Sequence, residues 1–284
     1  MRLHHMILGL GLALVVGIIN TARAEPVWQA GVFDMPESAV VDATRDRIIL
    51  STIVGHPGTA DGAGNLVLLS LDGEVLDPQW VSGLNAPKGM AIMGDSLLVT
   101  DLTHLHVVDL ATGDITQSIT APDAMFLNDV TADGSTAFIS DMMTHAIWRY
   151  TDGQLTLWMQ DEALSHPNGL LLDGDRLLVG SWGQGMQDDF TTTVPGSLLS
   201  IDLASQAITV VVPELGNLDG ITQIGDVLLV NDWVNGHLYR VSATGEVRLI
   251  AEHPAGLADI SSEGDMLFLP LMLDGQLIAE FYPG

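Results

Sequence analysis

The stretch HPNGLLLDGDRLLVGS, residues 166–181, predicts two short strands joined by a tight turn. Asp173-Gly174 lies between two apolar runs, and Asp-Gly in such a place is a strong signal for a β-hairpin. The second run, Leu177–Val179, is wholly apolar, which is typical of a strand that is buried on both faces. This hairpin decides the fold because the chain repeats it.

Five further stretches follow the same plan, at residues 38–50, 89–99, 129–139, 220–230 and 259–269. The residues that we place at the start of each unit's first strand are Glu37, Lys88, Asn128, Asn168, Asp219 and Asp259. Their spacings of 51, 40, 40, 51 and 40 residues give a period of 40, with 11 extra residues in the first and fourth units. A repeat of about 40–45 residues with several short strands is typical of a β-propeller blade. We therefore predict an all-β fold, a six-bladed β-propeller with four-stranded blades.

The two ends of the chain predict how the ring closes. The sixth unit ends after three expected strands, whereas residues 27–33 (VWQAGVF) precede the first unit and belong to no blade. We expect this N-terminal segment to join the last blade as its outer strand, which would remove an exposed strand edge. Residues 25–284 are thus expected to form one propeller domain.

Residues 1–24 have the features of a signal peptide. Arg2 supplies a positive start, residues 6–19 are mostly apolar, and Ala22-Arg23-Ala24 fits a cleavage site. Because the apolar run is short for a membrane span, we expect cleavage, a periplasmic or secreted protein, and no membrane contact afterwards. An uncleaved anchor is the alternative. The chain has no cysteine, so no disulfide bond supports the fold after export.

The chain is strongly acidic, with 36 Asp and Glu against 9 Lys and Arg and a formal net charge of −27. This charge argues against nucleic acid and anionic membrane surfaces as partners. It suits a protein that binds cations, or it serves solubility alone. We expect a monomer that acts on a small-molecule substrate.

The starts of the inner strands should meet at one mouth of the propeller axis. The two insertions, near residues 55–65 and 183–196, are expected at that same end, where long loops are usually functional. Glu37, Asn128, Asn168 and Asp219 would present carboxylate and amide oxygens, which are the ligands of calcium. No Cys or His occupies these positions, which disfavours zinc and copper. Alternatively, Asn and Asp stand there because they favour turns.

Four segments carry a resemblance to a known family: Pro36-Glu37-Ser38, Leu127-Asn128-Asp129, Pro167-Asn168-Gly169 and Leu218-Asp219-Gly220. They resemble the metal-site segments of the senescence marker protein / gluconolactonase / luciferin-regenerating enzyme family, whose members are six-bladed propellers. The likeness covers essentially the whole mature chain, through the blade count and the order Glu, Asn, Asn, Asp. It implies a divalent metal, most often calcium, and hydrolysis of lactones or related esters. By motif, Glu37, Asn168 and Asp219 would be metal ligands, and Asn128 a ligand or a substrate contact.

The resemblance implies a secreted, calcium-dependent hydrolase with Asp219, Asn128 and Lys88 in catalytic roles. Asp219, or a neighbouring carboxylate, would accept a proton from a water that the metal orients, although ligand and base roles compete. Lys88 is the only lysine of the chain; it could bind a substrate carboxylate or phosphate, or neutralise Glu37 or Asp259. The alternatives are a non-catalytic propeller that binds a ligand or a protein around a structural calcium, and a related enzyme that cleaves phosphotriesters or performs a condensation.

Two further features lie at the ends of second strands. Trp182 and Trp233 end such strands in the fourth and fifth units, where they would wall a pocket or pack between blades. His104 follows Asp101 in the second unit and would be a proton shuttle or a half-exposed loop residue.

Overall fold

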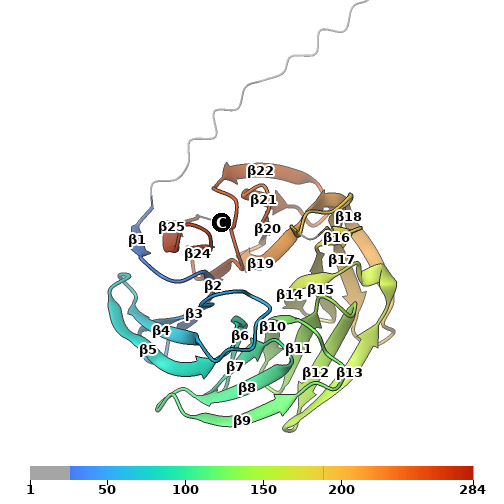
Figure 1. The fold of residues 1–284 in the computed structure, drawn as a ribbon. Helices are drawn as coiled ribbons and strands as arrows, with labels where there is room; N and C mark the ends of the chain where they lie inside the picture. Colours follow the sequence, from blue (N-terminus) through green and yellow to red (C-terminus); the bar gives the residue numbers. More distant parts are fainter. Residues whose placement is uncertain (1–25, 188, 284) are drawn as a thin grey trace, which may run out of the picture.

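The computed structural model describes residues 26–187 and 189–283, so the predicted signal peptide lies outside the described residues. The described residues form six antiparallel sheets around a central axis (Figure 1). This arrangement confirms the predicted six-bladed β-propeller. A three-residue 3-10 helix, Glu162–Leu164, interrupts the strands. In the described part of the chain, no helix is long and apolar enough to cross a membrane.

The first three blades each have four strands, ordered from the axis outward. Blade one contains β2 (Pro36–Asp42), β3 (Arg47–Thr52), β4 (Gly64–Ser70) and β5 (Val75–Leu84). Blade two contains β6 (Pro87–Met93), β7 (Ser96–Asp101), β8 (His104–Asp109) and β9 (Ile115–Thr120). Blade three contains β10 (Leu127–Asp133), β11 (Thr136–Asp141), β12 (Ala146–Thr151) and β13 (Gln154–Gln160).

The last three blades follow the same plan with two variations. Blade four contains β14 (Pro167–Asp173), β15 (Arg176–Ser181), β17 (Val194–Asp202) and β18 (Ile208–Gly216), with a short extra strand, β16 (Gly183–Gln184), on β17. Blade five contains β19 (Leu218–Ile224), β20 (Val227–Asp232), β21 (His237–Val241) and β22 (Val247–Glu252). Blade six contains β23 (Ser261–Glu263), β24 (Met266–Leu271), β25 (Gln276–Phe281) and β1 (Trp28–Gly31).

The apolar second strands form the centre of the core. Leu97, Leu98 and Val99 of β7 are fully buried, because side chains on both faces of the strand meet a neighbouring blade. One core cluster joins Leu98 of blade two to Ile139 of blade three, and the other clusters likewise join neighbouring blades. The hydrophobic core is therefore a ring of layers between the sheets.

The inner strand of five blades begins with a β-bulge. In blade one, Pro36 pairs with Thr52 and Ala39 pairs with Leu50, so Glu37 and Ser38 together oppose Ser51 alone. The free backbone N–H of Ser38 donates to Ser51 Oγ at 3.0 Å. Blades two to five show the same register shift. Because a bulge turns a side chain out of the regular alternation, each one can direct a residue toward the axis.

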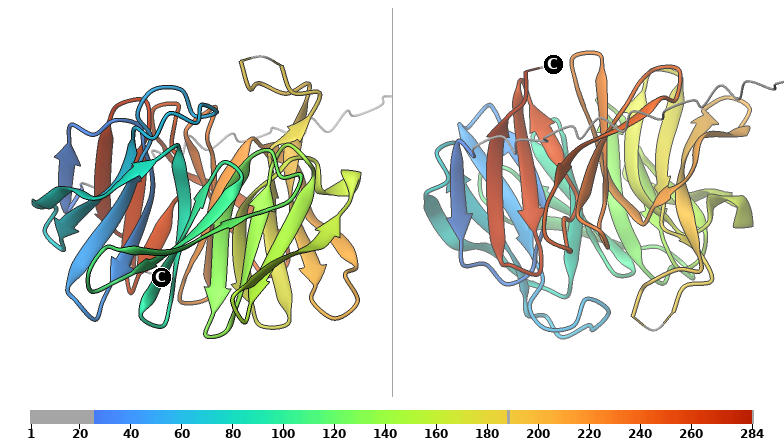
Figure 2. Two further views of the ribbon diagram at one scale, coloured as in Figure 1. Left: turned by 60° about the horizontal axis from the view of Figure 1, so that its bottom comes forward. Right: turned by 90° about the horizontal axis from the view of Figure 1, so that it is seen from above.

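The two insertions project from the same end of the ring, as predicted. Figure 2 shows in both views that the blue loop before β4 and the yellow loop before β17 extend beyond the blades on one side. The loops are the parts of the chain that can cover this mouth of the axis.

The N-terminal strand closes the ring, which confirms the prediction for residues 27–33. β1 pairs antiparallel with β25, with Trp28 opposite Ala279 and Gly31 opposite Gln276. Trp28 also crosses to blade one, because its indole Nε1 donates to the Leu71 carbonyl at 2.9 Å. The Trp28 ring lies 6.2 Å from that of Phe268, measured between centroids. One side chain thus holds the last blade to the first.

We predict that Trp28→Ala lowers the free energy of unfolding by about 2 kcal/mol, because it removes a partly buried ring and an inter-blade hydrogen bond. Urea unfolding followed by far-UV circular dichroism measures this change. Val32→Ala is the matched control, because Val32 is 96 % exposed. Deletion of residues 27–33 should abolish the cooperative transition; a deleted protein that unfolds like the full chain would show that closure adds nothing to stability.

Candidate functional site

The bulges place one residue from each inner strand around the mouth of the axis. By strand register these equivalent residues are Glu37, Lys88, Asn128, Asn168, Asp219 and Ala258. The first five line one pocket and are between 2 % and 6 % exposed. The structure therefore brings together all five residues that the sequence analysis placed in the site. We call these five residues the polar floor.

Asp259 does not belong to this ring, so its predicted place at the mouth is wrong. Leu257 bridges to Leu271 as Leu218 pairs with Asp232 in blade five. Ala258 is therefore the equivalent of Asp219, and Asp259 lies one position further along the inner strand. The sequence alignment slipped by one residue because Asp259 is the polar residue nearest to the expected position, and β23 itself is short.

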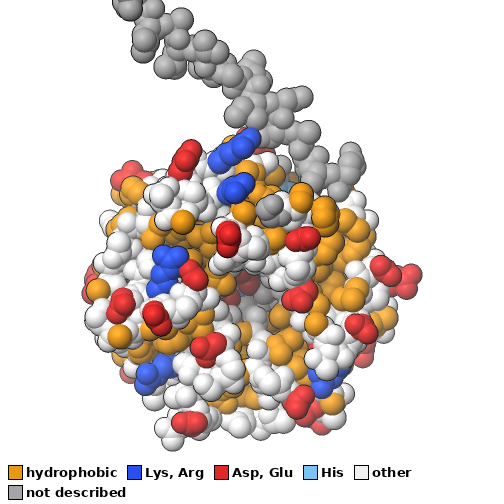
Figure 3. Space-filling view, turned by 180° about the vertical axis from the view of Figure 1, so that it is seen from behind, with side chains coloured by type: hydrophobic (Ala, Val, Ile, Leu, Met, Phe, Trp, Pro, Cys, Tyr) orange, Lys and Arg blue, Asp and Glu red, His pale blue; other side chains and the backbone are white. Residues whose placement is uncertain are grey.

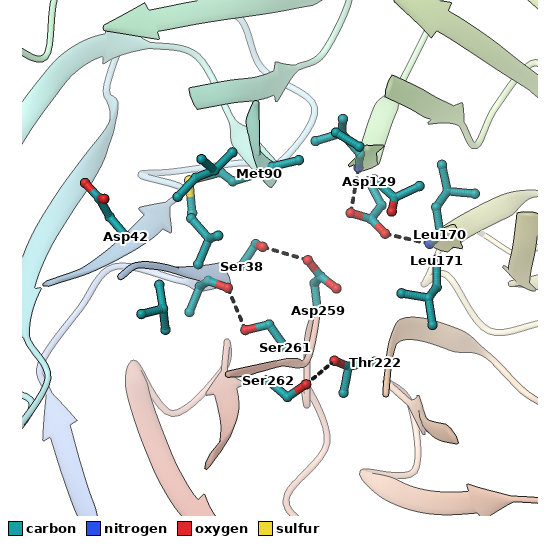
Figure 4. Close-up of a pocket in the computed structure, with 18 of the residues that line it drawn as sticks. Ser38, Asp42, Met90, Asp129, Leu170, Leu171, Thr222, Asp259, Ser261 and Ser262 are labelled. Carbon is teal, nitrogen blue, oxygen red and sulfur yellow. Dashed lines mark hydrogen bonds between the residues drawn. The ribbon is translucent and has the colours of Figure 1, made fainter. Parts of the chain in front are cut away.

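A second layer of residues surrounds the axis one position below the polar floor. Figure 4 shows Ser38, Asp129 and Asp259 facing this part of the axis. Ser38 Oγ donates to Asp259 Oδ2 at 2.6 Å. Asp129 accepts from the backbone N–H groups of Val130 and Leu170, each at 2.6 Å. Seen from behind, the molecule is hollowed at its centre, and acidic side chains outnumber basic ones on that face (Figure 3).

Glycine lets the inner strands approach each other in this second layer. A Cβ atom on Gly169 would lie 1.7 Å from the carbonyl oxygen of Asp219, which no side chain can tolerate. Gly220 is equally close to the next blade, where a Cβ atom would lie 2.2 Å from the Ile260 nitrogen. This contact distance brings the side chains of the polar floor close to one another.

The carboxylates near the axis are buried in one another's field. Burial raises the pKa of Glu37 well above its usual range, and the charges of Asp219 and Asp259 raise it further. The pKa of Asp219 is raised by burial and by Asp259, against a hydrogen bond from the Asn168 side chain. Burial raises the pKa of Asp259 to about 6. Like charges that are buried together need protons or a cation.

Lys88 supplies one positive charge to this cluster. Its Nζ donates to the carbonyls of Ala86 at 2.9 Å and of Pro57 at 3.2 Å, and lies 4.2 Å from the centroid of the Phe126 ring. Burial lowers the pKa of Lys88 to about 8, although Glu37 and Asp101 oppose this shift. Because both contacts with carbonyls hold the ammonium group in place, its position favours the counter-charge role over capture of a substrate anion.

Two buried oxygens in the polar floor have no hydrogen-bond partner. They are Glu37 Oε2 and Asn168 Oδ1. Buried acceptors are rarely left unpaired, because the loss of solvation costs about 1–3 kcal/mol each. Within residues 26–187 and 189–283, no three His, Cys, Asp or Glu side chains group as a metal site by themselves. A cation here would therefore need the amide oxygens of Asn128 and Asn168 beside the carboxylates of Glu37 and Asp219, a hard oxygen set that suits calcium.

The rest of the pocket is mostly apolar. Its volume is about 330 Å³, and the two insertions contribute His56, Pro57 and Phe190 to its lining. Trp182 and Trp233 both line it, with ring centroids 5.9 Å apart, as one of the two predictions for them required. His104 instead stacks on His106 in blade two, with ring centroids 5.9 Å apart, and contacts Thr103 and Thr120. This place favours the loop role for His104.

Sequence reasoning missed several lining residues, including Phe126, Met142 and Met272. A signal for two of them was present, because Met142 and Met272 follow the second strands of their blades as Trp182 and Trp233 do. Phe126 precedes the inner strand β10, and no local pattern distinguishes it from a core residue.

Comparison with known proteins supports the fold. No protein-family model matches the chain, and no similar sequence is found among curated proteins. Among solved structures, the chain is similar to a gluconolactonase from Xanthomonas campestris, with a TM-score of 0.64, 15% identity, and coverage of 88% of this chain and 86% of that one. It is also similar to virginiamycin B lyase from Staphylococcus aureus, with a TM-score of 0.62, 15% identity, and coverage of 87% and 95%.

A third similar structure comes from a nidogen/laminin complex, with a TM-score of 0.61, 15% identity, and coverage of 78% of this chain and 91% of that one. The three titles thus describe a lactonase, a lyase and a protein complex. At this level of identity, the likenesses show that the chain has the architecture of these proteins.

Proposed function

We propose that this protein is a calcium-dependent hydrolase that acts on lactones or related esters outside the cytoplasm. The observation that carries the proposal is the pair of buried, unpartnered oxygens, Glu37 Oε2 and Asn168 Oδ1, in the floor of a pocket of about 330 Å³. The similarity to a gluconolactonase structure supports the same reaction class. Export would give the protein access to calcium at the concentrations of about 10⁻⁴–10⁻³ M at which extracellular sites bind.

Four residues of the polar floor would hold the ion: Glu37, Asn128, Asn168 and Asp219. When bound, calcium would polarise the carbonyl group of the substrate and stabilise the negative charge that develops on its oxygen. The apolar lining would exclude bulk water from this place, which strengthens every electrostatic interaction in it. The open side of the floor faces the pocket, where a substrate has room.

The remaining chemistry belongs to the side chains of the floor. Asp219 is buried and its pKa is raised, so its ionised form is a stronger base than an ordinary carboxylate. We assign it the proton of the attacking water. The Asn168 side chain donates to Asp219 and orients it. The Asn128 amide would bind the substrate carbonyl or complete the oxygen cage, and Lys88 would offset part of the negative charge.

A binding propeller with a structural calcium is the second candidate. The structural similarity to a chain of a nidogen/laminin complex favours this alternative, because propellers also serve as binding modules. The two functions share the metal and differ in turnover, so a single experiment separates them.

We predict that the chelator-treated mature protein binds calcium, and that Glu37→Gln and Asn168→Ala each weaken binding at least about tenfold, because each removes a ligand oxygen or its charge. Calorimetric titration measures the affinity, and a parallel assay follows hydrolysis of small lactones and aryl esters. Glu263→Gln is the matched control, because Glu263 is exposed at the far end of blade six. Calcium binding without turnover would select the binding propeller, and unchanged affinity in both variants would remove the metal from the polar floor.

We predict that Asp219→Asn separates the roles of base and ligand. Asparagine keeps an oxygen that can bind calcium but cannot accept a proton, so calcium affinity should fall far less than kcat. The expected loss in kcat is about 10²–10⁴-fold. Asp226→Asn, on the exposed turn of the same hairpin, should leave both quantities unchanged. A variant that loses calcium and turnover in equal measure would show that Asp219 is a ligand only.

We predict that Lys88→Met raises calcium affinity at least about tenfold, because it removes a buried positive charge beside the cation site. The same change should lower the stability of the calcium-free protein by about 2–4 kcal/mol, since the carboxylates lose their counter-charge. Thermal unfolding with and without calcium measures both effects. Arg240→Met removes an exposed charge of blade five and serves as the control. Weaker calcium binding in Lys88→Met would contradict the counter-charge role.

A further inference from the structure

A second set of equivalent residues lies directly after the second strand of every blade. Its six members are all apolar: Ile53, Leu102, Met142, Trp182, Trp233 and Met272. Five of them line the same pocket as the polar floor, and Leu102 packs with Ile53 and Met272 in one apolar cluster. We call these six residues the apolar ring. The repeat of the fold thus builds one ring of polar residues and one ring of apolar residues into a single pocket.

The two insertions extend the apolar ring and are fixed to it by hydrogen bonds. The Trp182 indole Nε1 donates to the Phe190 carbonyl at 2.7 Å, which leaves the faces of the indole ring for apolar contact. Asn217 Nδ2 donates to Thr192 Oγ1 at 2.9 Å in the same loop. In the first insertion, the Pro57 carbonyl accepts from Lys88 Nζ. These contacts hold Phe190 and Pro57 at the pocket, where both are lining residues.

The polar groups of the pocket are concentrated at its floor. Apart from the five floor residues, His56 is the polar side chain in the lining of this pocket. A bound molecule therefore meets carbon and sulfur atoms everywhere except at its reacting end. Each hydroxyl group of a polyhydroxylated lactone would lose its hydrogen bonds to water at such walls and find few replacements. An alkyl or aryl group would instead gain from leaving water.

We propose that the pocket is selective for lactones or esters whose non-reacting part is an apolar alkyl or aryl group. Phe126, Met142, Trp182, Phe190 and Trp233 hold this group, while the polar floor receives the carbonyl. The cavity lies at the lower end of the range for small-molecule sites, about 300–1,000 Å³, which suits one ring with a short chain. The methionines can adapt to chains of different shape. This inference rests on the proposed hydrolase function for the reacting end of the substrate.

The test uses ligands that bind without reacting, so it does not depend on turnover. Three lactams resemble three lactones: unsubstituted piperidin-2-one, 6-pentylpiperidin-2-one, and the polyhydroxylated gluconolactam. Calorimetry and quenching of tryptophan fluorescence, to which Trp182 and Trp233 contribute from the pocket wall, give the affinities of the calcium-treated protein. We expect the pentyl compound to bind at least about thirtyfold more tightly than piperidin-2-one, given a gain of about fourfold per buried methylene. Gluconolactam should bind no better than piperidin-2-one.

Two variants assign the preference to the apolar lining. Phe190→Ala removes a ring from a loop, and Met142→Gln places an amide in the wall at nearly constant volume. Each should reduce the advantage of the pentyl group at least about fivefold, while calcium affinity, which reports an intact floor and fold, should stay the same. Leu76→Ala is the matched control, because Leu76 is 57 % exposed on the outer strand β5 and does not line the pocket.

The outcomes separate this inference from the proposed function. The hydrolysis of δ-valerolactone, δ-octalactone and δ-decalactone is measured in parallel. If calcium-dependent turnover occurs but the lactams show no preference for the pentyl group, or gluconolactam binds best, the inference is wrong and the hydrolase stands. If no lactone or ester is hydrolysed but the pentyl preference is present and is lost in Phe190→Ala, the apolar site stands and the hydrolase falls.

Discussion

The β-bulge at the start of the inner strands is the constraint on which the site depends. In a regular strand, Glu37 and Ser38 would point to opposite faces of the sheet; the bulge sets both against Ser51 and lets both approach the axis. The unpaired N–H group is then satisfied by a side chain of the second strand, from Ser51, Ser140 or Asn231 in three of the blades. Packing thus fixes the blades, and these hydrogen bonds fix the direction of the residues that line the axis.

The bulges concentrate negative charge where water is scarce. Glu37, Asp129, Asp219 and Asp259 are all at least nine-tenths buried, and Lys88 is the one cation whose charge acts on Glu37 from within the ring. Protons can neutralise part of this charge, as the raised pKa values indicate. A divalent cation would do the same without protonating the oxygens that serve as ligands or base. The same electrostatic cost that would destabilise an empty cluster therefore favours the binding of a metal ion.

The fold could be predicted from the sequence because each blade contains its own evidence. An apolar second strand and a turn of Gly and Asp identify a hairpin, and the constant spacing of the hairpins identifies the ring. The pocket residues Glu37, Lys88, Asn128, Asn168 and Asp219 followed from that spacing and lie together in the structure. Asp259 was misplaced because a bulge changes the register by one residue, and the sequence does not mark where this happens in the short strand β23. The calcium and the catalytic roles remain predictions.

The wall of the pocket was harder to predict than its floor. A polar residue at the start of a buried strand is conspicuous, whereas Met142 or Met272 after an apolar strand looks like ordinary core. What distinguishes these residues is their place at an end of the strand that faces the axis, which depends on the direction of the strand in the closed ring. Only when the six positions are compared does the shared apolar character become visible.

The division of labour between floor and loops has a physical consequence for specificity. The floor lies on inner strands that touch across glycines, so a change of size there would strain the whole ring. Phe190 and Pro57, in contrast, lie on insertions that reach the blades through a few hydrogen bonds, from Trp182 and Lys88. Their side chains can change without moving the oxygens of Glu37 or Asn168. Differences in substrate should therefore arise from the insertions and the apolar ring, while the chemistry of the reacting end stays tied to the bulges.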